Sequence, residues 1–130
     1  IYDMSGGVFE YMADYLANGT TSYVTYFKEN VSNRYKTEYK GDGPTTSTED
    51  RTANYEANSD RYGDALWETS NGAGGYYGWN QDYSDFPFLS SSFFARGDAY
   101  NDGAGAGVFA FGQANGSAFY RCSFRPVLGV

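Results

Sequence analysis

Residues 93–128 read FFARGDAYNDGAGAGVFAFGQANGSAFYRCSFRPVL, and this stretch decides the expected fold. Apolar runs at residues 93–96, 107–111 and 118–128 are separated by turns rich in Gly, Asn and Asp. Glycine at this density prevents a long helix, whereas short apolar runs between Asp-Gly and Asn-Gly turns are typical of hairpin strands. The last third of the chain is therefore predicted to be a small antiparallel sheet.

The chain upstream of this stretch has weaker patterns. Residues 8–12 fit either a short strand or the beginning of a helix, since the apolar spacing suits both periods. Residues 18–62 are polar and are predicted to form a long excursion, within which residues 23–33 have the spacing of a short amphipathic helix that packs through Tyr23, Phe27 and Val31. Residues 63–69 are predicted to be a half-buried strand or turn, with Leu66 and Trp67 as anchors.

Composition limits the function classes. At 130 residues the chain has the size of one domain, and its net charge of -7 argues against nucleic acid as a partner, because a phosphate backbone requires a basic surface. Aromatic residues make up 20% of the chain, so rings are expected to build most of the core. No stretch approaches the roughly 18 apolar residues of a membrane span, and no membrane insertion is expected.

Residues suited to catalysis are scarce. Cys122 is the one cysteine and histidine is absent, which excludes an internal disulfide and a cysteine-based zinc cluster and removes the commonest general base. A bound metal would have to be a hard cation on oxygen ligands. Asn80, Asp82 and Asp85 could hold calcium, but loop capping is the preferred interpretation because no further ligand lies nearby, and no cofactor is otherwise expected.

Three blocks of the sequence resemble a known family in the same order. They are YDMSGGVFEY at residues 2–11, FFARG at residues 93–97 and SFRPVL at residues 123–128. The set resembles the formylglycine-generating-enzyme-like branch of the C-type lectin fold and, within it, the variable proteins of diversity-generating retroelements; Gly7 and Phe9 depart from the pattern. The resemblance implies a single α+β, C-type lectin-like domain over residues 1–130, with short helices, a small antiparallel sheet and long irregular loops, lacking an N-terminal portion of a longer protein.

The same resemblance implies a binding surface between residues 96 and 125. In the retroelement-diversified proteins this interval is the variable region, whose surface positions change on a constant scaffold. The positions that map to the variable, ligand-binding set are Asp98, Tyr100, Asn101, Asp102, Ala104, Phe109, Phe111, Gln113, Phe119, Tyr120, Arg121 and Cys122. Tyr and Phe suit this role because they give a large contact area at a small entropic cost.

Charged residues within the three blocks have a structural interpretation. Glu10, Arg96 and Arg125 could form a catalytic cluster, but one arginine is more simply expected to pair with Glu10 and tie the first block to the terminal sheet. The formylglycine-generating enzymes use a pair of cysteines, and only Cys122 is present, so their chemistry is not carried over and an enzyme is not expected.

The aromatic residues between 76 and 94 allow two interpretations. They could form a platform on which sugars stack, or they could lie mostly in the core, and the core is preferred. Tyr76, Tyr77 and Trp79 are the expected exposed exceptions, since the glycines around them leave little to bury them.

These observations favour a ligand-binding display domain, used in receptor binding or adhesion by a bacterium or phage. The expected partner is a protein or glycan ligand, and the expected location is extracellular, on a cell surface or on a phage virion. The alternative is a structural subunit of a bacterial surface filament or pilin-like assembly, in which the aromatic residues would pack on neighbouring subunits.

Overall fold

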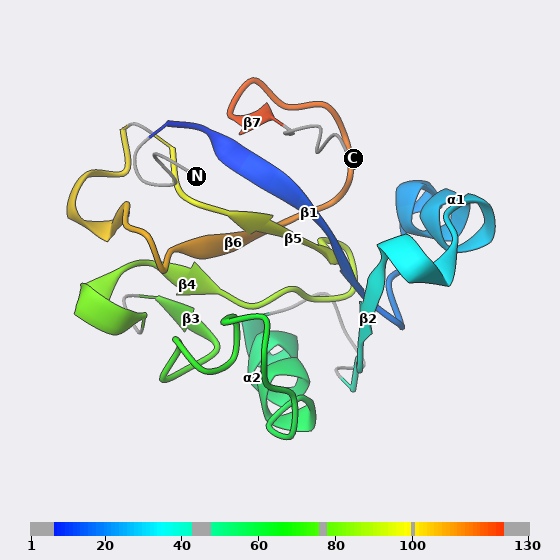
Figure 1. Ribbon diagram of the computed structural model, residues 1–130, viewed down its shortest axis with the longest axis horizontal. Coiled ribbons are helices and arrows are strands. Elements are labelled where there is room, and N and C mark those ends of the chain that lie inside the picture. The colour runs from blue at the N-terminus through cyan, green and yellow to red at the C-terminus, as the bar shows by residue number, and fades with distance from the viewer. Residues whose placement is uncertain (1–6, 43–47, 76–77, 100, 124–130) are drawn as a thin grey trace.

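The computed structural model describes residues 7–42, 48–75, 78–99 and 101–123, with the backbone alone at residues 48–50. These residues form two α-helices and a seven-stranded sheet (Figure 1), which confirms the predicted α+β class. In chain order the elements are β1 (Phe9–Leu16), α1 (Ser22–Asn30), the 3-10 helix η1 (Asn33–Tyr35), β2 (Thr37–Tyr39), α2 (Thr48–Ala57), β3 (Gly74–Gly75), η2 (Trp79–Gln81), β4 (Ser84–Asp85), β5 (Phe93–Arg96), η3 (Gly103–Gly105), β6 (Phe111–Ala114) and β7 (Cys122–Ser123).

The sheet is mixed, so the predicted small antiparallel sheet is found only in part. Its strand order is β2-β1-β5-β6-β4-β3, and β7 pairs with β1. The pairs β1–β5, β5–β6 and β3–β4 are antiparallel, whereas β1–β2, β1–β7 and β4–β6 are parallel. Parallel neighbours require a long crossover, and the segment that carries α1 and η1 provides one between β1 and β2.

Helix α1 confirms the helix predicted at residues 23–33, with a different buried face. Thr21 caps its N-terminus, where the hydroxyl accepts a hydrogen bond from Val24 N at 3.3 Å. Val24 is fully buried and Phe27 packs beside it, while Tyr23 is 51% exposed. The helix therefore packs through residues 24 and 27, not through Tyr23.

Helix α2 lies in the segment predicted to be a polar excursion. Among the described side chains of α2 and the residue after it, the fully buried ones are amides, Asn54 and Asn58, instead of an apolar stripe. Asn54 Nδ2 donates to Pro87 O at 3.0 Å, and Asn58 Nδ2 donates to Lys40 O at 2.8 Å. Because hydrogen bonds to the backbone attach this helix, hydrophobic periodicity could not reveal it.

The core is built largely from rings, as the composition predicts. Its main cluster consists of Leu16, Tyr39, Leu66, Phe86, Phe94 and Phe111. Phe86 and Phe94 meet edge to face, with 5.1 Å between ring centroids. A smaller cluster of Tyr15, Val24 and Phe93 lies under α1. Residues 63–69 form bends and a turn, which is one of the two predicted alternatives, and Leu66 is fully buried, as expected of an anchor.

The last third of the chain matches its predicted strands only in part. β5 has the predicted bounds, but β6 begins at Phe111 instead of running from 107 to 111. Residues 107–110 form a turn instead, in which Ala110 N donates to Gly107 O at 3.1 Å. A second hydrogen bond, from Gly97 N to Ala110 O at 3.0 Å, closes the base of the loop between β5 and β6. Strand β7 covers Cys122–Ser123, and the remainder of the predicted strand at 118–128 beyond Ser123 lies outside the described residues.

Candidate functional site

Two cavities lie on either side of Phe9, at the beginning of β1. The first, called here the acidic cavity, has a volume of about 270 Å³ and is lined by Phe9, Tyr83, Asp98, Asp102 and Gly105. The second, called the apolar cavity, has a volume of about 260 Å³ and is lined by Phe9, Tyr11, Ser91, Ala95, Gln113, Ala114, Asn115, Ser117, Phe119 and Cys122. Five of the twelve residues mapped to the binding surface therefore line the two cavities: Asp98, Asp102, Gln113, Phe119 and Cys122.

Gly112 allows Phe9 to lie between the two cavities. A Cβ atom at position 112 would come within 3.0 Å of Phe9 Cε1, so the ring lies directly on the glycine backbone. Phe9 is also held by its own backbone, since Phe9 N donates to Arg121 O at 2.7 Å. Phe9 and Tyr83 are wall residues that the sequence analysis did not assign, and the departure of Phe9 from the family pattern was its one signal.

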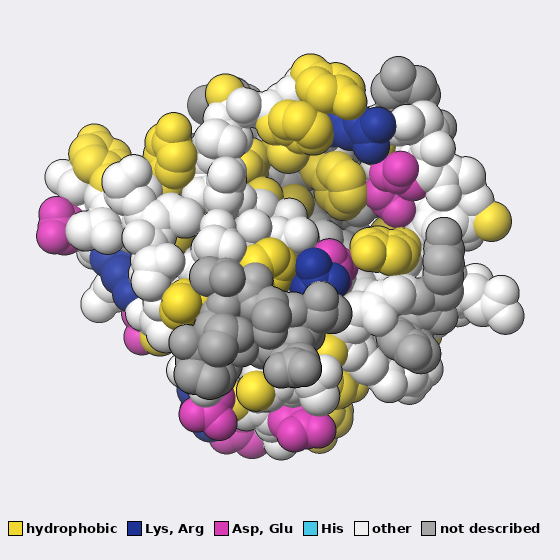
Figure 2. Space-filling view, turned by 180° about the vertical axis from the view of Figure 1, so that it is seen from behind, with side chains coloured by type: hydrophobic (Ala, Val, Ile, Leu, Met, Phe, Trp, Pro, Cys, Tyr) yellow, Lys and Arg dark blue, Asp and Glu magenta, His cyan; other side chains and the backbone are white. Residues whose placement is uncertain are grey.

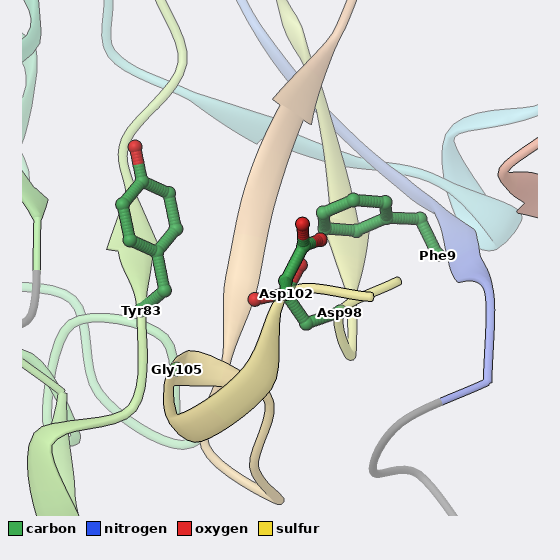
Figure 3. A pocket seen from close by; sticks show the side chains of 5 residues that line it. All are labelled: Phe9, Tyr83, Asp98, Asp102 and Gly105. Carbon is green, nitrogen blue, oxygen red and sulfur yellow. The ribbon is translucent and has the colours of Figure 1, made fainter. Parts of the chain in front are cut away.

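Asp98 and Asp102 form the chemical centre of the acidic cavity. Figure 3 shows their carboxyl groups close together beside the ring of Phe9, with Tyr83 on the other side of the cavity. Ala99 N donates to both of them, to Asp98 Oδ1 at 2.9 Å and to Asp102 Oδ2 at 3.1 Å. Asp98 is only 3% exposed, and this burial, with the neighbouring Asp102 carboxylate, raises the pKa of Asp98 to about 7.

Arg121 connects the acid pair to two exposed rings. Its Nη1 lies 3.7 Å from Asp102 Oδ1, and its guanidinium carbon lies 5.4 Å from the centroid of the Tyr120 ring. The Phe119 and Tyr120 rings are 4.6 Å apart and are 51% and 74% exposed. On the face seen from behind, hydrophobic side chains gather toward the upper edge, beside basic and acidic groups (Figure 2). The arrangement places a charge pair and a pair of rings on one surface.

The wall of the apolar cavity is fixed by polar contacts. Tyr11 OH donates to Ser117 O at 2.9 Å, and Asn115 Oδ1 accepts hydrogen bonds from both Ser117 N and Ser117 Oγ. Burial raises the pKa of the Cys122 thiol, which keeps it protonated and weakly nucleophilic. The apolar cavity therefore suits a nonpolar group with an amide-rich rim, and its thiol is not activated.

The η2 loop extends the surface beyond the mapped residues. Trp79 is 51% exposed and its ring lies 5.2 Å from that of Phe109, centroid to centroid. Asn80 and Gln81 have φ angles of 61° and 67°, in the left-handed region that side chains rarely adopt. Asp82 holds this loop to the next, because its Oδ2 accepts from Phe109 N at 2.9 Å. Exposed Trp79 agrees with the prediction, and Tyr76 and Tyr77 lie outside the described residues.

The two aspartates considered as calcium ligands have other partners. Asp82 caps the turn at Phe109, and Asp85, 5% exposed, forms an ion pair with Arg51 at 2.5 Å. Burial raises the pKa of Asp85 and the Arg51 charge opposes that rise. Among the residues that the structure describes, no group of three or more His, Cys, Asp or Glu is placed to hold a metal ion.

The structure divides the mapped binding residues by exposure. Exposed are Asn101, Ala104, Phe119 and Tyr120; half-buried are Asp102, Phe109, Gln113, Arg121 and Cys122; buried are Asp98 and Phe111; Tyr100 lies outside the described residues. Phe111 is a correction, because it is 1% exposed and belongs to the main core cluster, where no partner can reach it. Asp98 is equally buried but borders the acidic cavity.

The charged residues of the three blocks are partly brought together. Glu10 and Arg96 are direct cross-strand partners in the β1–β5 register, and Arg96 also donates to Asp64 O. Arg125 lies outside the described residues. The aromatic residues expected in the core are found there in the case of Phe86, Phe93 and Phe94, while Tyr83 and Phe88 are half-buried.

In comparisons with protein-family models, curated proteins and solved structures, nothing matches the chain. Within the described ranges, no helix has the length and apolar character needed to cross a membrane. The site must therefore be interpreted from its own geometry.

Proposed function

We propose that this chain is a ligand-binding display domain with a C-type lectin-like fold, and that its binding surface is formed by the loops between β5 and β7 together with η2. The observation that carries the proposal is the pair of exposed rings, Phe119 and Tyr120, next to two cavities on a surface fixed to the sheet. Exposed aromatic residues beside pockets supply much of the energy in protein interfaces. The ligand would be a protein or glycan on a cell or phage surface.

The order of the strands supports the lectin-like part of the proposal. The first block of the family pattern contributes β1, the second contributes β5, and the two pair directly through Glu10 and Arg96. β7 ends at Ser123, where the third block begins, and it pairs with β1 through Cys122 and Ser123. In the family pattern the same three blocks belong to one scaffold beneath the variable loops.

Binding is preferred to catalysis on the chemistry of the side chains. The sequence has no histidine, and the thiol of Cys122 has a raised pKa. The acid pair in the acidic cavity holds a proton near neutral pH, but its partners within the described residues are the backbone amide of Ala99 and the Arg121 guanidinium. The site is thus proposed to recognise a ligand, in an extracellular or virion setting, without transforming it.

The alternative is a subunit of a surface filament, and one observation favours it. Tyr26 and Tyr35, in and after α1, are 67% and 66% exposed, and neither lines the two cavities, so they offer a second set of aromatic contacts. Two aromatic regions on one chain could contact two neighbours head to tail. Sedimentation velocity over a range of concentrations separates the two functions, since assembly without ligand would support the filament.

The binding proposal is tested on arrays of defined oligosaccharides and of purified surface proteins. The double variant Phe119→Ala/Tyr120→Ala should weaken a hit by at least about tenfold, because the two rings would be the main contacts. The matched control is Tyr26→Ala/Tyr35→Ala, which removes two equally exposed rings elsewhere. Equal losses in both variants, with both folded by circular dichroism, would contradict the assignment of the surface.

A further inference from the structure

A pair of acids, the buried Asp98 and the half-buried Asp102, lies at the point where the binding loop meets the segment with the exposed rings. Asp98 lies two residues after the end of β5 and Asp102 is the residue before η3, so the pair encloses one turn of the loop. Asp102 N donates to Ala99 O at 2.9 Å, and Ala99 N donates back to both carboxyl groups. The turn is therefore held by hydrogen bonds that end on the two acids.

The same pair links the turn to the rest of the surface. Arg121, 3.7 Å from Asp102, belongs to the segment that carries Phe119 and Tyr120 and whose carbonyl at 121 accepts from Phe9 N. Across the acidic cavity, β1 contributes the uncharged ring of Phe9 and the segment before β4 contributes the phenol of Tyr83. Of the charged groups in the described residues, Asp102 and Arg121 are those that act on Asp98.

We propose that the Asp98–Asp102 pair is a proton-controlled latch, which fixes the turn and its link to Arg121 when it holds one proton and loosens both when it is fully ionised. With one proton, Asp98 donates its O–H to the Asp102 carboxylate and the pair carries a single negative charge opposite one arginine. When the proton leaves to solvent, two carboxylates, of which that of Asp98 is buried, face each other with the same single cation. Repulsion and burial then both oppose the closed turn.

The pKa values of Asp98 and Asp102 set the direction and the pH range of the stability change. The pKa of Asp98 is about 7, above its ordinary 3.8, whereas the hydrogen bond from Asp98 lowers the pKa of Asp102. A folded-state pKa above the unfolded value means that the folded chain binds the proton more tightly, so stability is greatest at low pH and is lost as the pH rises through 7. The protonated fraction of Asp98 falls from about 0.9 at pH 6 to about 0.1 at pH 8.

The latch is tested on the free chain by NMR between pH 5 and 9. The Ala99 amide donates to both acids, so its chemical shift should change with a midpoint near pH 7. Its hydrogen exchange should also speed up between pH 6 and pH 8 by roughly tenfold more than the intrinsic pH effect, because the open population of the turn rises by about that factor. The Ser117 amide is the internal control, since it donates to the uncharged side chain of Asn115. A midpoint for Ala99 below pH 5, or equal behaviour of both amides, would overturn the proposal.

Variants give a second measurement. In wild type the thermal midpoint should fall from pH 6 to pH 8, and Asp98→Asn should remove most of this fall, while Asp60→Asn, which alters an exposed acid paired with Lys40, should keep it. If Asp98→Asn does not fold, the carbon-13 titration of the Asp98 carboxyl in wild type decides the matter. A fall that persists in Asp98→Asn would contradict the latch.

The effect on ligand binding rests on the proposed function, but the latch itself does not. The NMR titration uses no ligand, so a flat titration removes the latch and leaves the binding surface standing. Loss of the binding proposal on the arrays would leave the titration unchanged. If both hold, a hit on the array should bind more tightly at pH 6 than at pH 8 in wild type and equally at both in Asp98→Asn.

Discussion

The main core cluster and the face around Phe9 are built from the same kinds of residue and use them in opposite ways. In the core, the rings of Phe86, Phe94 and Phe111 leave no exposed area above 1%, and Phe86 meets the other two edge to face. Around Phe9 the rings enclose two cavities instead. The difference arises from what surrounds the rings, since the face has glycine and polar loop contacts where the core has other rings and leucines.

The largest expected loss of stability comes from removing a ring from the main core cluster. Phe94→Ala should lower the free energy of unfolding by about 3–5 kcal/mol, because the ring is fully buried and contacts the rings of Tyr39, Phe86 and Phe111. Urea denaturation followed by circular dichroism measures it. Phe119→Ala removes the same ring from the exposed face and should cost less than about 1 kcal/mol. Similar losses in the two variants would mean that the face is packed as tightly as the core.

A smaller effect concerns how each region keeps a buried carboxyl. Asp85 is neutralised by Arg51, at 2.5 Å, whereas no cation among the described residues comes so close to Asp98, which instead holds a proton near neutral pH. Arg51→Met should therefore destabilise the fold by about 3 kcal/mol at pH 7, because it leaves a buried carboxylate without its cation and with only the long hydrogen bond from Gln113 Nε2, at 3.5 Å. Without Arg51 the pKa of Asp85 rises further, so the loss should shrink as the pH falls toward 5.

Denaturation of Arg51→Met at pH 7 and pH 5 checks both parts of this expectation. Lys40→Met is the matched control, since its pair with Asp60 is 63% and 71% exposed and should contribute less than about 1 kcal/mol. A pH-independent loss in Arg51→Met would indicate that packing of the arginine, and not its charge, supports α2 against β4.

The smallest effect sharpens the description of the apolar cavity. Tyr11→Phe removes the hydrogen bond to Ser117 O, at 2.9 Å, and should cost about 1 kcal/mol while loosening the wall of the cavity. Amide exchange at Ser117 and thermal unfolding measure the two consequences. Tyr26→Phe, at a ring that is 67% exposed, should stay within about 0.5 kcal/mol of wild type. Unchanged exchange at Ser117 would show that the turn holds itself through Asn115.

Sequence patterns predicted the elements in which apolar spacing carries the structure. β5 was predicted at its observed bounds, β1 was one of two interpretations of residues 8–12, and α1 was found within three residues of its ends. Helix α2 was missed because Asn54 and Asn58 anchor it through hydrogen bonds, which leave no periodic apolar signal. Where contacts are polar and distant in sequence, periodicity has nothing to measure.

The site was predictable in location but not in detail. Phe109 and Phe111 were both assigned to the binding surface, yet the turn closed by Ala110 N and Gly107 O breaks the alternation, so Phe109 borders Trp79 while Phe111 enters the core. The proximity of Asp98, Asp102 and Arg121 depends on β7 returning beside β1, which no local pattern encodes.

The hydrogen bond from Gly97 N to Ala110 O marks the loop between β5 and β6 as a position where a peptide can be inserted. It closes the loop between β5 and β6 at its base, next to strands that pair in register from Arg96–Phe111 to Phe93–Ala114. A foreign segment inserted in the loop between Gly97 and Ala110 would leave the hydrogen bonds between β5 and β6 intact. Doubling the length of the loop would cost only about 0.6 kcal/mol in closure entropy. The same sheet could thus serve as a scaffold for inserted peptides of different sizes.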